Sequence, residues 1–154
     1  MKKIIILLSL FVLIGCKSKS VIEKPKEVVI VRLSPSEVDN SLKNKAYELG
    51  KRVLMTCNTS TFKPFTSSEA TPKVIENTTQ SRLTQTCLKF RLKYGAFKDI
   101  QLVEVIQNKA DRTNIFRYKA IYQKKIANKE LRVTMNEENK VSAINSKDWT
   151  DNYN

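Results

Sequence analysis

The spacing of apolar residues changes at Gly95, and this change constrains the fold more than any other feature of the sequence. Before Gly95 the apolar residues recur three or four positions apart, as they do on one face of a helix. After Gly95 they follow the two-residue period of a strand. Helices grouped before strands are typical of the α+β class. We therefore expect an α+β domain in which N-terminal helices pack on a curved, four-stranded antiparallel sheet.

The first helix is expected to begin at Ser34-Pro35-Ser36-Glu37, where a serine cap, a proline and a glutamate three residues after the cap coincide. Its apolar face is formed by Val38, Leu42, Ala46, Leu49, Val53 and Cys57. In the loop that follows, Phe62 and Phe65 should fold back onto the core. Thr71-Pro72 indicates another helix start, and the helical pattern is firm over 82–94. The apolar face of this second segment consists of Leu83, Cys87, Phe90 and Tyr94.

Four strands are expected, over 100–107, 114–124, 130–135 and 140–144, with a turn at 136–139. In the first strand, alternation places Ile100, Leu102, Glu104 and Ile106 on one face. In the second strand, one face carries Phe116, Tyr118, Ala120 and Tyr122, and the other carries Ile115, Arg117, Lys119 and Ile121. Two interpretations remain for the run Val28-Val29-Ile30-Val31, which is either a short strand or an apolar part of a tether. Trp149 is expected to close the domain.

The N-terminus has the organisation of an export signal. Met1-Lys2-Lys3 is basic, and the apolar run over 4–14 has 11 residues, whereas a bilayer span needs about 20. The run ends in Leu13-Ile14-Gly15-Cys16, which resembles the lipobox of bacterial lipoproteins. This resemblance implies cleavage before Cys16, a diacylglycerol on its sulfur and stable membrane anchoring. An ordinary secretory signal and a short uncleaved anchor are the alternatives.

The lipobox divides the chain into a signal peptide (1–15), a lipidated Cys16 with a basic tether (16–33), one α+β domain (34–149) and a C-terminal tail (150–154). Lys17 directly after the cysteine favours the outer membrane, because an aspartate at this position favours inner-membrane retention in familiar sorting systems. We therefore expect a lipid-anchored protein of the bacterial cell envelope.

The domain also carries a weaker resemblance. Tyr94-Gly95-Ala96-Phe97-Lys98-Asp99-Ile100 and the acidic turn before Lys140-Val141-Ser142-Ala143-Ile144 are similar to motifs of a domain family of unknown function in small exported bacterial proteins. The order of helices and strands resembles the cone-shaped nuclear transport factor 2-like and cystatin-like folds. The resemblance implies that the concave face of the sheet wraps around a helix.

Two cysteines remain once Cys16 is lipidated. Cys57 and Cys87 lie on apolar helix faces, and the cell envelope is oxidising. They form either a disulfide that joins the two helices or a pair of buried free thiols. Redox catalysis needs closer spacing or an activated thiolate, and the sequence shows neither.

Composition narrows the chemistry further. The chain has no histidine, which excludes a Ser-His-Asp triad, a Cys-His pair and a His-ligated zinc. The formal net charge of +13 would suggest nucleic acid if taken alone. The expected location in the cell envelope and the absence of RNA- or DNA-binding motifs argue against nucleic-acid binding. Anionic lipid or glycan is a better-placed partner, and a solvated basic surface is the alternative. We expect no catalytic residue, metal site or cofactor.

One pocket is expected on the concave face of the sheet. Phe116, Tyr118 and Tyr122 could line it, and Glu104 could contribute a lone carboxylate. The alternatives are plain core for the aromatic residues and an outward-facing carboxylate for Glu104. Two functions follow. The first is a non-enzymatic envelope lipoprotein that binds a protein partner or an anionic envelope component. The second is a small-ligand carrier or inhibitor with an apolar pocket between sheet and helix.

Overall fold

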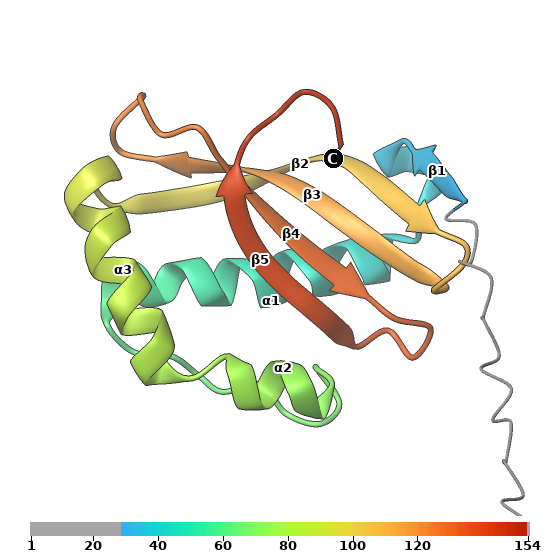
Figure 1. Cartoon of the computed structure of the whole chain (residues 1–154), viewed down its shortest axis with the longest axis horizontal. Coiled ribbons are helices and arrows are strands. Elements are labelled where there is room, and N and C mark those ends of the chain that lie inside the picture. The colour runs from blue at the N-terminus through green and yellow to red at the C-terminus, as the bar shows by residue number, and fades with distance from the viewer. Residues whose placement is uncertain (1–28, 154) are drawn as a thin grey trace, which may run out of the picture.

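The computed structural model describes residues 29–153 (Figure 1). The expected signal peptide, Cys16 and most of the expected tether lie outside the described residues. The helical elements are η1 (Pro35–Glu37), α1 (Asn40–Thr59), α2 (Pro72–Asn77) and α3 (Gln80–Tyr94). The strands are β1 (Ile30–Leu33), β2 (Phe97–Asn108), β3 (Thr113–Tyr122), β4 (Lys129–Met135) and β5 (Val141–Asp148). The fold is α+β, as the change of period at Gly95 predicted.

The sheet has five strands rather than the expected four. Its order is β1-β2-β3-β4-β5, and every neighbouring pair is antiparallel. The additional strand, β1, pairs Ile30 with Asn108 and Leu33 with Val105. Of the two interpretations left open for this run, the strand holds for residues 30 and 31. The expected tether range of 16–33 therefore overlaps the edge of the sheet.

The start of the first helix differs from the prediction. Ser34-Pro35-Ser36-Glu37 forms the 3-10 turn η1, in which the Glu37 carboxylate accepts a hydrogen bond of 2.6 Å from the Ser34 backbone N–H. Val38 is extended, and α1 begins at Asn40 with Asp39 as its cap, because the Asp39 carboxylate accepts the Leu42 backbone N–H at 3.0 Å. The chain thus contains two consecutive N-terminal capping arrangements, and only the second one starts the long helix.

Helix α1 lies along one face of the sheet and supplies the centre of the core (Figure 1). Ala46, Leu49 and Val53 are buried, as their spacing predicted. Gly50 sets the approach distance. A Cβ at this position would lie 2.9 Å from side-chain atoms of both Leu131 and Val133. The absence of a side chain therefore lets the helix backbone come closer to the sheet.

The helix start expected at Thr71-Pro72 is confirmed, because Thr71 is the N-cap residue of α2. Helix α3 begins two residues before the predicted range, with Thr79 as its N-cap residue, and ends at Gly95, which has a φ of 78°. The rings of Phe62 and Phe65 are buried and contact each other edge to face, with centroids 5.5 Å apart. These contacts close the loop between α1 and α2 onto the core.

Candidate functional site

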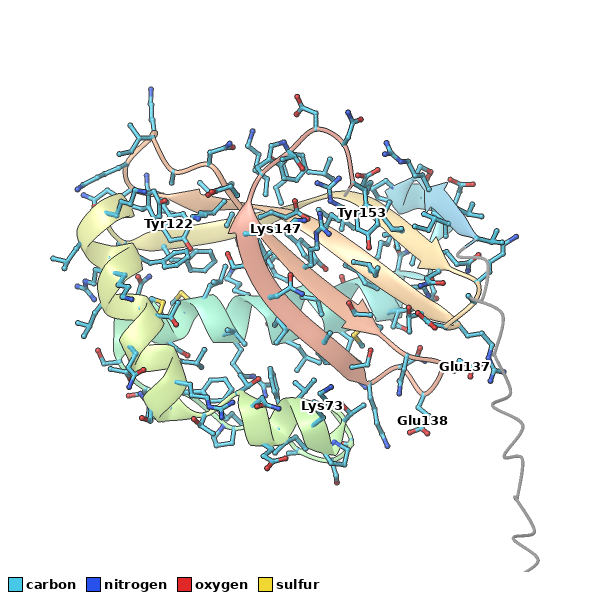
Figure 2. All side chains as sticks on the ribbon, viewed as in Figure 1. Lys73, Tyr122, Glu137, Glu138, Lys147 and Tyr153 are labelled. Atoms are coloured by element: carbon cyan, nitrogen blue, oxygen red, sulfur yellow. A yellow bond between two sulfur atoms is a disulfide. The ribbon has the colours of Figure 1, made fainter. Side chains whose placement is uncertain are left out.

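A disulfide joins α1 to α3. Cys57 and Cys87 are bonded in the structure, with an S–S distance of 2.09 Å (Figure 2). Arg91, one turn further along α3, donates hydrogen bonds to the carbonyl oxygens of Cys57 and Asn58 at 3.3 and 3.1 Å. These carbonyls end α1, where a cation is favourable. The covalent bond and the polar contacts together fix α3 to the C-terminal end of α1.

The expected aromatic pocket is filled core. Phe116, Tyr118 and Tyr122 are 0, 1 and 6 % exposed. Tyr122 packs between Phe97 and the aromatic residues of α3. Burial raises the pKa of both tyrosines well above the ordinary value. Of the two interpretations given for this stripe, plain core is the one that the structure shows.

Glu104 lies on the opposite face of the sheet from these aromatic residues. The register of β2 against β3 shifts between Leu102 and Glu104, because Val103 is an extra residue in β2. Leu102 therefore pairs with Tyr118 toward α1, while Glu104 pairs with Arg117 on the outer face. The strict alternation assumed from the sequence fails at this bulge. Of the two interpretations given for Glu104, the outward-facing carboxylate is the one that the structure shows, because Glu104 pairs with Arg117 and Arg32 there.

An ion cluster occupies that outer face. Arg117 and Glu130 are both 0 % exposed, and two of their hydrogen bonds measure 2.9 and 2.8 Å. Arg117 also donates to Glu104, and Arg132 donates to Glu130. Burial by itself would raise the pKa of Glu130, but the hydrogen bonds from the two arginines outweigh it and hold the pKa below its ordinary range. The cluster is therefore charged at neutral pH.

The C-terminal segment covers this ion cluster. The Arg117 guanidinium lies 4.7 Å from the ring centre of Trp149 and donates to the carbonyl oxygen of Thr150 at 2.8 Å. Tyr153 lies over Arg132 at 4.4 Å (Figure 2). Residues 150–153, expected to form a tail, thus pack on the domain. This cluster was not predicted from the sequence. Glu130 and Arg132 lie two residues apart on β4, and β3 places Arg117 opposite Arg132.

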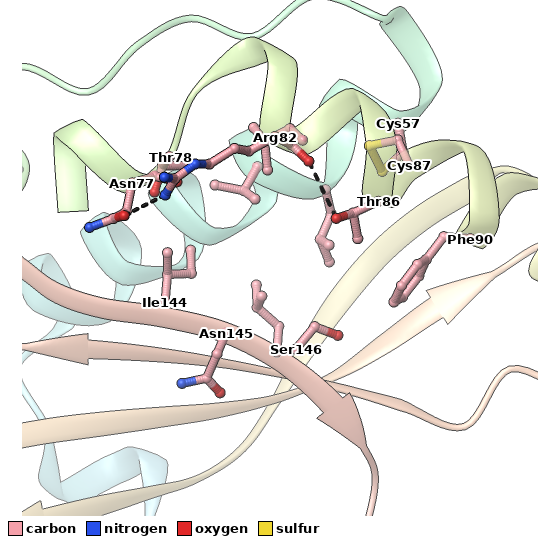
Figure 3. Close-up of a pocket in the computed structure, with 14 residues that line it drawn as sticks. Cys57, Asn77, Thr78, Arg82, Thr86, Cys87, Phe90, Ile144, Asn145 and Ser146 are labelled. Atoms are coloured by element: carbon pink, nitrogen blue, oxygen red, sulfur yellow. Dashed lines mark hydrogen bonds between the residues drawn. A yellow bond between two sulfur atoms is a disulfide. The ribbon is translucent and has the colours of Figure 1, made fainter.

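A groove of about 250 Å³ lies elsewhere, between α3 and β5 (Figure 3). Its floor comes from α1 and β4 through Val53, Leu54 and Leu131. Ile144 and Ser146 of β5 face α3 across the opening, and the helices supply its other wall. That wall consists of Asn77, Thr78, Arg82, Leu83, Thr86, Cys87 and Phe90. None of the four residues predicted to line a pocket belongs to this groove.

A second surface feature lies where α3 ends beside the β3–β4 loop. Leu88, Leu92 and Ile126 are 62, 80 and 71 % exposed. Lys124 joins the two elements, because its ammonium donates to the Leu92 carbonyl at 3.1 Å and its backbone N–H to the Tyr94 carbonyl at 3.0 Å. We call these three apolar residues and the surrounding cations the α3 patch. The cations are Lys89, Arg91, Lys93, Lys124 and Lys125.

The charge of the α3 patch is largely uncompensated, and Lys93 is the cation that adds to the effect of Lys129 in lowering the pKa of Asp148. The sequence has no Asp or Glu over 77–98 or over 112–129, and these two stretches supply the whole patch. Within residues 29–153, none of its five cations forms an ion pair with a carboxylate. The ones with hydrogen bonds donate to carbonyl oxygens, which leaves the net charge unchanged. Exposed apolar side chains thus lie within a basic surface.

The described residues hold no group of three Cys, Asp or Glu side chains that could bind a metal ion. Among residues 29–153, no helix is long and apolar enough to cross a bilayer.

Comparisons with protein-family models, curated proteins and solved structures find no match to this chain.

Proposed function

We propose that this protein is a non-enzymatic lipoprotein of the bacterial outer membrane, anchored through Cys16, whose α+β domain docks onto an anionic lipid surface. The observation that carries this proposal is the α3 patch. Leucine and isoleucine side chains surrounded by lysine and arginine match the interface of an anionic membrane, where apolar groups enter the headgroup region and cations meet phosphates. Among the expected partners, this surface favours an anionic lipid over a protein.

The energetics support docking as an addition to the anchor. Each Lys or Arg near an anionic leaflet contributes roughly 1 kcal/mol, an interaction that salt screens. A single contact of this kind is weak, but a tether keeps the domain at a high effective concentration beside the membrane. The acyl chains then provide retention, and the α3 patch orients the domain.

The geometry allows the anchor and the α3 patch to reach one membrane. The Val29 carbonyl oxygen accepts the Lys109 backbone N–H, so the chain enters the domain beside the end of β2. The α3 patch lies at the other end of β2, a strand of 12 residues that is about 40 Å long (Figure 1). The chain from Cys16 to Val29 has 13 residue steps and reaches at most about 45 Å when extended. The domain can therefore lie lengthwise along the membrane surface.

The named fold is also a proposal. The likeness to nuclear transport factor 2-like and cystatin-like cones is supported by α1 lying along one face of a twisted antiparallel sheet.

Anchoring is tested by replacing Cys16 with alanine. Cells fed an alkyne analogue of palmitate should label the wild-type protein and leave Cys16→Ala unlabelled. The wild type should fractionate with membranes after a high-salt wash. Lipid labelling of Cys16→Ala at the wild-type level would contradict the proposal.

Docking is tested with the lipidated full-length protein in nanodiscs, using a tryptophan as a depth probe. Leu92→Trp places the probe in the α3 patch, and Val103→Trp places a matched probe at another exposed apolar residue, 42 % exposed on β2. Relative to the native Trp149 emission of the wild-type protein, brominated phosphatidylglycerol should quench the added emission of Leu92→Trp and leave that of Val103→Trp unchanged. Quenching should fall in 0.5 M salt and in the double variant Lys124→Gln/Lys125→Gln. Equal quenching of both probes, or none, would overturn the docking proposal.

A further inference from the structure

A second binding site is indicated by the groove between α3 and β5, which is separate from the α3 patch. We infer that this groove binds a small amphiphile with an apolar body and an anionic head group, such as a medium-chain carboxylate. The inference goes beyond surface docking, since it concerns a single molecule held inside the domain and would stand if the α3 patch had no lipid partner.

The groove exists because the helices are held at a distance from β5. The disulfide and Arg91 hold α3 against α1, and α2 packs near β5 through the bridge between Ala70 and Val141. Between these two attachments, α3 does not close onto the sheet. The disulfide, whose cysteines themselves line one wall, thus fixes the position of α3, and a ligand can enter without separating packed elements.

The lining predicts an apolar body for the ligand. Val53, Leu54 and Leu131 form a buried floor, and Leu83, Phe90 and Ile144 are half-buried along the sides. A dry cavity of about 150 Å³ holds benzene, and sites for drug-sized molecules begin near 300 Å³. A groove of about 250 Å³ lies between these sizes. It suits an alkyl chain of roughly eight to ten carbons or a single substituted ring.

The rim predicts an anionic head group. Arg82 is the one charged residue among those lining the groove, and no carboxylate lines it. The Arg82 guanidinium donates to the side-chain and backbone oxygens of Asn77, which are neutral, so its charge has no counterion within residues 29–153 (Figure 3). The hydroxyl of Thr78 lies at the same end of the groove, whereas the Asn77 amide N–H donates to the Lys73 carbonyl oxygen. A carboxylate or phosphate would find a cation and a neutral donor there.

The site is tested by photoaffinity labelling of the lipidated full-length protein in nanodiscs, with decanoic acid that carries a diazirine on its chain. Mass spectrometry of the labelled peptides should place the adducts within residues 82–90 and 141–148. Free decanoate should compete with the label. Competition by a decanoyl lysophospholipid as well would indicate that the acyl chain of a lipid is also accepted.

Two matched pairs of variants separate groove binding from partition into the lipid. Thr86→Trp fills the groove, whereas Gln85→Trp adds the same ring one residue away, on a part of α3 that does not line it. Labelling should fall at least tenfold in the first variant and stay unchanged in the second. Arg82→Gln should weaken competition by decanoate about five- to tenfold without affecting competition by decanol, and Lys98→Gln, a change at an exposed lysine of β2 that does not line the groove, should change neither. Equal labelling of the two tryptophan variants, or adducts confined to Leu88, Leu92 and Ile126, would overturn the inference.

Discussion

The surroundings of Arg117 in the structure differ from those that its position in the sequence suggests. It alternates with apolar residues on β3, which by itself suggests a cation in water. In the structure it is 0 % exposed and contacts Glu104, Glu130 and Trp149. A guanidinium tolerates such burial only because carboxylates and a carbonyl accept its donors.

Glu130→Gln should therefore destabilise the domain strongly. The change removes the charge that compensates two buried arginines, and breaking a buried pair costs about 3–5 kcal/mol. Urea denaturation followed by circular dichroism measures the loss. Glu137→Gln is the matched control, because Glu137 forms an exposed pair with Arg112 whose loss should cost less than about 1 kcal/mol. Equal losses in the two variants would contradict this account of the cluster.

At the residue scale, the sequence predicted burial better than it predicted the partners of polar groups. Ala46, Leu49 and Phe116 are buried as their spacing indicated. Glu104 is misplaced because one extra residue, Val103, shifts the alternation of β2, and a bulge of this kind carries no glycine to mark it. Burial of Arg117 depends on residues 149–153 folding back over the sheet, a contact between distant segments that local periodicity does not encode.

At the scale of elements, the disulfide links the two helices that form the floor and one wall of the groove. Cys57 and Cys87 are 30 residues apart in the sequence. In the chain-entropy model, a loop of this length stabilises the folded state by roughly 3–4 kcal/mol. Because α3 contacts the sheet less than α1 does, the bond should contribute more to the position of α3 than to the core.

Reduction should therefore lower the free energy of unfolding by about 3 kcal/mol. The double variant Cys57→Ser/Cys87→Ser should show the same loss and no further response to dithiothreitol, because it has no bond left to reduce. Hydrogen exchange should increase first in α3 and remain slow in β3 and β4. An unchanged denaturation midpoint after complete reduction would contradict this prediction.

The long elements were predictable, whereas the two shortest, β1 and η1, were not. Helix α1 and strand β3 each present enough residues for a period to be recognised. Strand β1 has four residues and no fully buried one, so its sequence is equally compatible with a tether. The capping sequence at Ser34 is real, but it starts only η1, because Val38 adopts an extended conformation before Asp39 caps α1.

At the scale of the whole molecule, carboxylates held by arginines determine how the fold responds to acid. Two hydrogen bonds from Arg52 are the main reason that the pKa of Glu69 is lowered to about 2. The pKa of Glu130 is also lowered. A carboxyl group whose pKa is lower in the folded state stabilises the fold fully above its unfolded pKa. This contribution disappears as the pH falls toward the folded pKa.

The free energy of unfolding should therefore be constant near neutral pH and fall between about pH 5 and pH 2. Urea denaturation at a series of pH values measures this dependence. Glu69→Gln should lower the free energy of unfolding at pH 7. It should also make the decline at acidic pH less steep, because an amide side chain takes up no proton in this range. Arg52→Met should make the decline less steep in the same way, because it removes the hydrogen-bond partner of Glu69. A decline in either variant as steep as that of the wild type would contradict the role of this pair.

The arrangement of whole elements also explains why the groove was not predicted where it lies. The sequence indicated a sheet, a long helix and apolar faces, from which a pocket between sheet and first helix followed. Gly50 removes that space by bringing α1 close to Leu131 and Val133. The opening arises instead beside α3, whose distance from β5 is set by contacts of α2 and by the disulfide.

The position of β1 has a mechanical consequence. Antiparallel hydrogen bonds run perpendicular to the strands. Ile30 pairs with Asn108 at the end of β2, and Leu33 pairs further in with Val105. A force that reaches the domain through Val29 along the strand axis is therefore shared by all the bonds of this ladder at once. The same force applied sideways would break them one at a time. The shortest strand of the sheet thus acts as a shear clamp between the chain that precedes it and the folded domain.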